Sequence, residues 1–293
     1  MKRLVDFDER DALLGATFYL LLFVLLSRGL AIFGGALLGA GWYWLAPLAY
    51  LVPLALALVW SRGALLRFGK RPCARGMADT LPLLPLFLAA VMALSHLSAL
   101  VLDALHLPVS GGGATGAGFV PDLLFNCLLP AVLEELFFRG LILSLLLRRF
   151  GSGAIFLSAL CFALAHGSLY QLPYAFVGGV FLALSAVVGR SVFYPMLFHL
   201  LNNLISLALQ YTQTAWEHIL PPYVLVYIFV AIFSVVAVVY LLFCKDCAAR
   251  GEIKALFASP KESAREVLRG AFASPLTCFL LPMLILTVGR VFL

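Results

Sequence analysis

The chain has 293 residues, of which 63% are hydrophobic and 12% are charged. A soluble globular domain carries about 25% charged residues, so this composition excludes one and indicates an integral membrane protein in contact with the lipid bilayer. The formal net charge of +6 indicates no nucleic-acid partner, because the basic residues fall in short clusters between apolar runs, as in proteins that cross membranes.

Apolar runs near the bilayer-spanning length of about 20 residues recur along the chain. They predict nine transmembrane helices, at residues 14–37, 42–60, 80–102, 119–147, 153–170, 172–189, 192–210, 222–243 and 273–292. Lysine and arginine concentrate in the cytoplasmic loops of membrane proteins. With the N-terminus in the cytoplasm, every lysine and arginine lies in a cytoplasmic segment except Arg28, Arg139 and Arg290. We therefore predict an all-α polytopic protein of the plasma membrane, with about nine transmembrane helices and a cytoplasmic N-terminus.

Two segments outside the predicted spans are interpreted as scaffold. Residues 109–120, "VSGGGATGAGFV", are rich in glycine and predict a flexible outer loop. Residues 259–272 predict a short cytoplasmic surface helix, since Ser259 and Glu262 have the spacing of a capping box. The basic side chains of this helix are expected to face anionic lipid headgroups.

Three central spans contain charged or polar side chains at bilayer depth. A charge there costs roughly 2.5–3.5 kcal/mol on insertion scales, so such residues usually mark a functional site. Counting about 1.5 Å per residue from the cytoplasmic ends places these groups in one shared layer inside the bundle. They are Glu134, Glu135 and Arg139 in span 119–147, His166 in span 153–170, and His199 and Asn203 in span 192–210.

The two adjacent glutamates lie on different faces of their helix. Glu135 and Arg139 are four residues apart with the acid first, which is the favoured orientation of a helical ion pair. Glu134 points about 100° away around the helix. The spacing therefore predicts that Glu135 neutralises the arginine, while Glu134 is free to take part in chemistry.

Three short motifs follow one another on these spans. "EELFFR" (134–139) fits E-E-x-x-x-R, "FALAH" (162–166) fits F-x-x-x-H, and "HLLNN" (199–203) fits H-x-x-x-N. In this order they resemble the CPBP intramembrane proteases, which include the type II CAAX prenyl endopeptidases and the bacteriocin-processing and Abi-type relatives. The resemblance covers residues 119–210 and implies a helical bundle that holds a peptidase site within the membrane.

The resemblance implies a role for each motif residue. Glu134 would act as general base with His166, and together they would activate a water. His199 and Asn203 would stabilise the oxyanion, because they project from one face of their helix and an imidazole beside an amide donor suits a developing negative charge. Asn202, one position earlier, is expected to point elsewhere. The supporting residues would be Glu135 and Arg139.

The mechanism has a metal-dependent alternative. Two histidines and a glutamate are also a catalytic zinc set, which here would be Glu134, His166 and His199. We favour hydrolysis without a metal or other cofactor, because every motif residue then has a role and the chain contains no H-E-x-x-H motif.

The sequence thus predicts an intramembrane endopeptidase that cleaves a membrane-associated protein or peptide. The predicted organisation is a three-span region with the outer loop (1–118), a catalytic core (119–210), and a two-span region with a cytoplasmic loop helix (211–293). One alternative is a proton-coupled transporter that uses the polar cluster as a relay, although the duplicated halves of such carriers are not found. The other alternative is a catalytically silent membrane scaffold. The fact that every motif position is filled argues against it.

Overall fold

The computed structural model of the protein describes residues 9–60, 68–69, 71–109, 118–212, 222–243, 251, 253–254, 257 and 263–289. Among these residues nearly all regular structure is helical, and the only β pairing is an isolated bridge between Gly69 and Ser191. Together with the apolar composition, this architecture is that of the predicted class, a helical membrane protein.

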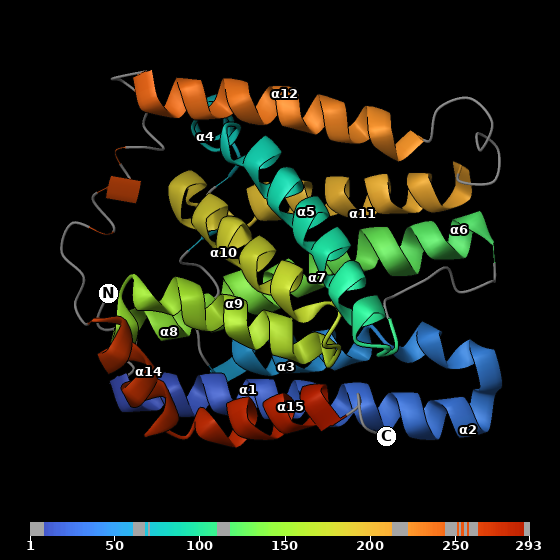
Figure 1. The fold of residues 1–293 in the computed structure, drawn as a ribbon. Coiled ribbons are helices and arrows are strands. Elements are labelled where there is room, and N and C mark those ends of the chain that lie inside the picture. Colours follow the sequence, from blue (N-terminus) through green and yellow to red (C-terminus); the bar gives the residue numbers. More distant parts are fainter. Residues whose placement is uncertain are drawn as a thin grey trace.

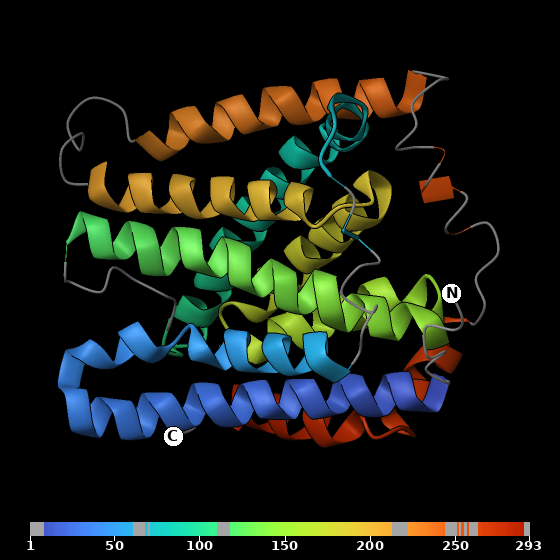
Figure 2. The same cartoon turned by 180° about the vertical axis from the view of Figure 1, so that it is seen from behind.

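The N-terminal helices form one outer layer of the bundle (Figure 1, Figure 2). They are α1 (Glu9–Gly29), the π-helical η1 (Leu30–Gly34), α2 (Gly35–Leu38), the 3₁₀-helical η2 (Gly39–Leu45) and α3 (Leu48–Trp60). The chain turns back at Gly39, whose φ of 54° suits glycine because it lacks a Cβ. As a result α3 returns alongside α1, and the C-terminal helix α15 (Thr277–Gly289) packs against α1 as well.

A long helical run forms the middle of the bundle. It comprises α6 (Phe119–Asp122), η4 (Leu123–Leu128), α7 (Leu129–Glu135), η5 (Leu136–Ile142) and α8 (Leu143–Phe150). The sequence predicted one regular span at 119–147, whereas the π-helical segments η4 and η5 lie on either side of α7. The last two residues of α7 are Glu134 and Glu135, so the two carboxylates lie next to a π-helical turn, a feature that is frequent at functional sites.

Two inclined helices cross the others (Figure 1). They are α5 (Leu83–Ala104), which follows the short α4 (Ala74–Thr80), and α10 (Leu172–Gly189), and they pack against each other. On its other side α10 approaches α9 (Gly153–His166) very closely. A Cβ added at Gly179 would lie 3.1 Å from the Cα of Ala159, so a larger residue here would push the two backbones apart by a few tenths of an ångström.

Helix α9 ends earlier than the predicted span 153–170. Gly167 adopts a left-handed conformation with φ 61°, and its N–H bonds the carbonyl of Leu164. This is a common way to terminate a helix. His166 is therefore the last helical residue of α9 rather than a residue in the middle of a span.

Helices α11 (Phe193–Thr212) and α12 (Pro222–Phe243) complete the side of the bundle opposite α1 (Figure 1, Figure 2). The predicted surface helix is α14 (Ala264–Phe272), which begins later than expected. Its capping box is formed by Ser263 and Glu266, whose backbone and side-chain groups bond each other. The capping box predicted at Ser259 and Glu262 lies outside the described residues, as do residues 110–117 of the predicted outer loop.

Among the described residues, four helical segments are long and apolar enough to cross a membrane, namely Ala12–Leu38, Leu83–Ala104, Leu172–Gly189 and Val224–Phe243. A fifth is obtained if α14 and α15, which meet at 94°, form one broken span. The run 119–150 and α11 are less apolar because they contain the charged and amide side chains of the predicted site. Helices occur in each of the nine predicted ranges, while the number of spans and the orientation of the N-terminus stay predictions.

Candidate active site

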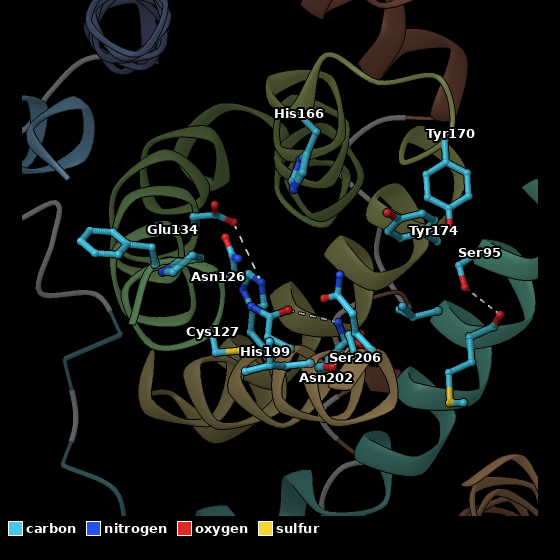
Figure 3. A pocket seen from close by; sticks show the side chains of 17 residues that line it. Ser95, Asn126, Cys127, Glu134, His166, Tyr170, Tyr174, His199, Asn202 and Ser206 are labelled. Atoms are coloured by element: carbon cyan, nitrogen blue, oxygen red, sulfur yellow. Dashed lines mark hydrogen bonds and ion pairs between the residues drawn. The ribbon is translucent and has the colours of Figure 1, made fainter. Parts of the chain in front are cut away.

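The four residues predicted to be catalytic line one cavity of about 400 Å³. Glu134 comes from α7, His166 from the end of α9, and His199 and Asn203 from α11. Figure 3 shows Glu134, His166 and His199 pointing into a common space from three different helices. The fold therefore brings together polar groups that are up to 69 positions apart in the printed sequence.

A fully buried ion pair lies behind this cavity. Arg139 Nη1 donates to Glu135 Oε1 at 2.8 Å, and Nη2 donates to the carbonyl oxygen of Gly179 at 3.2 Å. The guanidinium also lies 4.3 Å from the centre of the Phe162 ring, a cation–π contact that a desolvated site strengthens. Through these contacts Arg139 joins the central helical run to both α9 and α10.

Glu135 has a second partner that the sequence analysis did not predict. The same Oε1 atom accepts a hydrogen bond from His199 Nδ1 at 2.8 Å. Because a carboxylate oxygen is the acceptor, Nδ1 is the protonated nitrogen and Nε2 is directed away from Glu135. Nε2 lies 4.0 Å from Glu134 Oε2. When Nε2 is also protonated, His199 presents an N–H donor to the cavity.

His166 is held by its own helix. Its Nδ1 lies 2.8 Å from the carbonyl oxygen of Phe162. A carbonyl can only accept, so this nitrogen bears the proton, and in the neutral ring Nε2 keeps its lone pair. Figure 3 shows the ring directed into the cavity. His166 is thus oriented to accept a proton from a group bound there.

Glu134 is held from a different part of the chain. The hydroxyl of Tyr50, on α3, donates to Glu134 Oε1 at 3.0 Å. The two residues are 84 positions apart, and Tyr50 belongs to none of the three motifs. No pattern in the sequence indicates this contact, since it depends on how the N-terminal helices pack against the central run.

The amide of Asn203 is oriented by its neighbour. Asn202 also lines the cavity, and its Nδ2 donates to Asn203 Oδ1 at 3.3 Å. The expectation that Asn202 points elsewhere was therefore wrong. The reason is that both positions face a wide cavity, so that residues about 100° apart on the helix can reach it. With its oxygen occupied, Asn203 has its amide hydrogens available as donors.

Several other polar and aromatic residues of the cavity wall were not predicted. Tyr170 and Tyr174, with ring centres 5.4 Å apart, form one side. Asn126 lines another side and donates to the buried Asp122 at 3.0 Å, which also accepts from the hydroxyl of Tyr211 at 2.8 Å. The i,i+4 spacing of Asp122 and Asn126 is a signal that was available in the sequence.

The predicted alternative metal ligands are Glu134, His166 and His199. Both histidines have Nδ1 bonded to an acceptor and Nε2 free, which is how metal-bound histidines are usually oriented. However, among the described residues no three His, Cys, Asp or Glu side chains are grouped closely enough to hold a metal ion. The arrangement of Glu134, His166 and His199 therefore does not fit a zinc site, and we derive no step through a metal.

An apolar groove of about 830 Å³ lies beside the polar cavity. It runs between α5, α11 and α12, and its walls include Leu84, Leu88, Ile205, Phe229 and Phe233. The cavity itself is lined by the next residues along two of these helices, Val91 and Met92 on α5 and Ser206 on α11. The groove and the cavity are therefore neighbours along the same pair of helices.

The fold and this cavity define the class of the protein, a multi-pass helical membrane protein with a polar cavity inside its bundle. Residues 116–205 match the family described as "Type II CAAX prenyl endopeptidase Rce1-like". The matched segment contains all three motifs and confirms, over these residues, the predicted resemblance to the CPBP intramembrane proteases. Comparisons with the curated proteins and with the solved structures gave no match.

Proposed function

We propose that the protein is an intramembrane endopeptidase of the plasma membrane that hydrolyses a peptide bond of a membrane-associated protein or peptide. The observation that supports this most directly is that Glu134, His166, His199 and Asn203 line one cavity inside the segment that matches the protease family. Their shared cavity supports a reaction in which a base and oxyanion donors act on the same bound peptide.

The first step is the attack of water on the peptide carbonyl. A water in the cavity lies between Glu134 and the free Nε2 of His166, and gives one proton to Glu134 as its oxygen bonds to the carbonyl carbon. The π electrons of the carbonyl move onto its oxygen, which becomes an oxyanion. His166 accepts a hydrogen bond from the second hydrogen of the water and so orients the attack.

The second step is the departure of the amine. Asn203 and protonated His199 donate hydrogen bonds to the oxyanion, and preorganised donors of this kind stabilise the tetrahedral intermediate. When the oxyanion collapses, the carbon–nitrogen bond breaks and the leaving nitrogen takes the proton from Glu134. The products are a carboxylic acid and an amine, and Glu134 returns to its ionised form.

A membrane-associated substrate is supported by the surroundings of the cavity. The groove between α5, α11 and α12 has walls of leucine, valine, isoleucine and phenylalanine, and α12 exposes many apolar side chains, among them Phe229 and Phe233. An apolar membrane anchor placed in this groove brings the adjoining polar segment next to Glu134. The description of the matched family names CAAX prenyl endopeptidases, whose substrates also join a peptide to an apolar group.

The experiment that tests the proposal compares protein and peptide termini in membranes of cells that produce the wild type or Glu134→Gln. This variant keeps the shape of the side chain and removes the base, so we expect a set of new termini to disappear while the protein level is unchanged. Asp103→Asn removes an exposed carboxylate outside the cavity and should leave all termini in place. If the termini of Glu134→Gln were identical to those of the wild type, the proposal would be wrong.

A second experiment tests whether hydrolysis needs a metal ion. With the purified full chain and a peptide found by the comparison of termini, a strong chelator should leave turnover unchanged. If chelation abolished turnover and added zinc restored it, the water would be activated by a metal ion, and Glu134, His166 and His199 would be its ligands.

A further inference from the structure

On the basis of the proposed function, we infer that Tyr50 is a positioning residue of the active site. It holds one oxygen of the Glu134 carboxylate, so that the other oxygen, Oε2, is the atom that takes the proton from water. The inference brings a residue of the N-terminal helices into the site, outside residues 116–205 that match the protease family.

The two oxygens of Glu134 have different surroundings. Oε1 accepts the hydrogen bond from the Tyr50 hydroxyl at 3.0 Å, whereas Oε2 faces Nε2 of His199 at 4.0 Å. A distance of 4.0 Å is too long for a hydrogen bond and leaves Oε2 free to bond a water in the cavity. The hydrogen bond to Oε1 fixes the rotation of the carboxylate, which decides which oxygen points at that water.

The ring of Tyr50 is itself fixed by packing. It lies against Phe23 of α1 and Phe137 of η5, with ring centres 4.7 and 6.1 Å away. Phe23 and Phe137 are both buried, so the hydroxyl is held in place by two neighbouring elements. The N-terminal layer thus acts on the catalytic carboxylate through one rigid side chain.

Tyr50 acts only through Glu134. It is not among the residues that line the cavity, so it does not touch a bound substrate. Phenylalanine at this position would keep both ring contacts and lose only the hydroxyl. The hydroxyl is therefore the part of the side chain that serves the reaction, and a variant exists that removes it alone.

The test is Tyr50→Phe in the purified full chain, assayed with a fluorogenic peptide that spans a cleavage site found by the comparison of termini. Misplacement of a reacting group typically costs up to about 100-fold, so we expect kcat to fall about 10- to 100-fold with KM within about twofold. The variant changes the orientation of the catalytic carboxylate and not a contact with the peptide, so the division of the effect between kcat and KM is the diagnostic measurement.

Two measurements separate this role from a structural one. Tyr19→Phe removes a hydroxyl from α1, in the same layer but outside the cavity wall, and should keep the wild-type kcat and KM. The rate is divided by the amount of folded, monodisperse enzyme, so kcat remains informative if Tyr50→Phe lowers the yield.

The outcomes distinguish this inference from the proposed function. If Glu134→Gln is inactive but Tyr50→Phe has the kcat and KM of the wild type, the role of Tyr50 is overturned and the proposed function stands. If KM rises while kcat is unchanged, Tyr50 contributes to binding and the inference is equally wrong. If Glu134→Gln retains full activity, both fail together.

Discussion

At the level of single residues, one buried carboxylate serves two neighbours. Glu135 Oε1 accepts hydrogen bonds from both Arg139 and His199, and the side chains of Glu135 and Arg139 are completely buried. The ion pair and the proposed oxyanion donor therefore share an atom. A change at Glu135 is expected to affect stability and catalysis together, whereas its spacing from Arg139 predicted only the ion pair.

The variant Glu135→Gln tests this coupling. It leaves Arg139 without a counter-charge in a dry layer, and breaking a buried pair in this way typically costs about 3–5 kcal/mol. It also weakens the acceptor of His199, so we expect a lower kcat in addition to a lower melting temperature in detergent. Glu134→Gln provides the matched control, with loss of activity at an unchanged melting temperature. Equal melting temperatures for the two variants would contradict the different roles of the glutamates.

The amide pair of α11 gives a second prediction for single residues. Asn203→Ala removes a donor from the oxyanion, and such a loss typically lowers kcat about 10²–10³-fold. Asn202→Ala should have a smaller effect, because it removes only the group that orients Asn203. Both are measured as kcat under saturating substrate. An Asn203→Ala enzyme with wild-type kcat would show that this residue is not an oxyanion donor.

The motifs were sufficient to predict four residues that share the cavity, but neither the rest of its wall nor how these residues contact one another. Glu134, His166, His199 and Asn203 were identified from type and spacing, which are local properties of the chain. The bonds from Tyr50 to Glu134 and from His199 to Glu135 join residues 84 and 64 positions apart. Such bonds depend on tertiary packing, which helical periodicity does not encode.

At the level of elements, the close packing of α9 on α10 positions the ion pair. Gly179 lies where these helices touch, and its carbonyl oxygen accepts from Arg139. The helices themselves were predictable from apolar runs, but their ends were not. Gly167 ends α9 by a left-handed backbone conformation, and the π-helical segments on either side of α7 interrupt a pattern that looked like one regular span.

The variant Gly179→Ala tests the contribution of this contact. Its added Cβ would lie 3.1 Å from the backbone and side chain of Ala159, so α10 must move away and the bond to Arg139 lengthens. Overpacking of this kind typically costs about 1–3 kcal/mol. We expect a lower melting temperature for Gly179→Ala and an unchanged one for Gly289→Ala, where no atom of the described residues outside its own helix turn lies within 4 Å of the added group. Equal shifts in both variants would show that the contact is not under strain.

At the level of the whole molecule, the distribution of basic residues predicts the orientation in the membrane. Single cysteines at positions 71 and 112 of a cysteine-free variant test it with an impermeant thiol reagent in intact cells. Position 112, which lies outside the described residues, should react, and position 71 should react only after the membrane is opened. The opposite pattern would place the N-terminus outside the cell, and wild-type activity of the cysteine-free variant is the control for its fold.

The division of the cavity wall among the helices affects how the substrate specificity of the proposed enzyme can change in evolution. The proposed catalytic groups belong to α7, α9 and α11, whereas Val91, Met92 and Ser95 of α5 complete the wall, and α12 closes the neighbouring groove. The proposed catalytic helices and the helices proposed to contact the substrate are thus encoded by separate stretches of the gene. We therefore expect that substitutions in α5 and α12 can alter which substrate is accepted while the catalytic groups are kept.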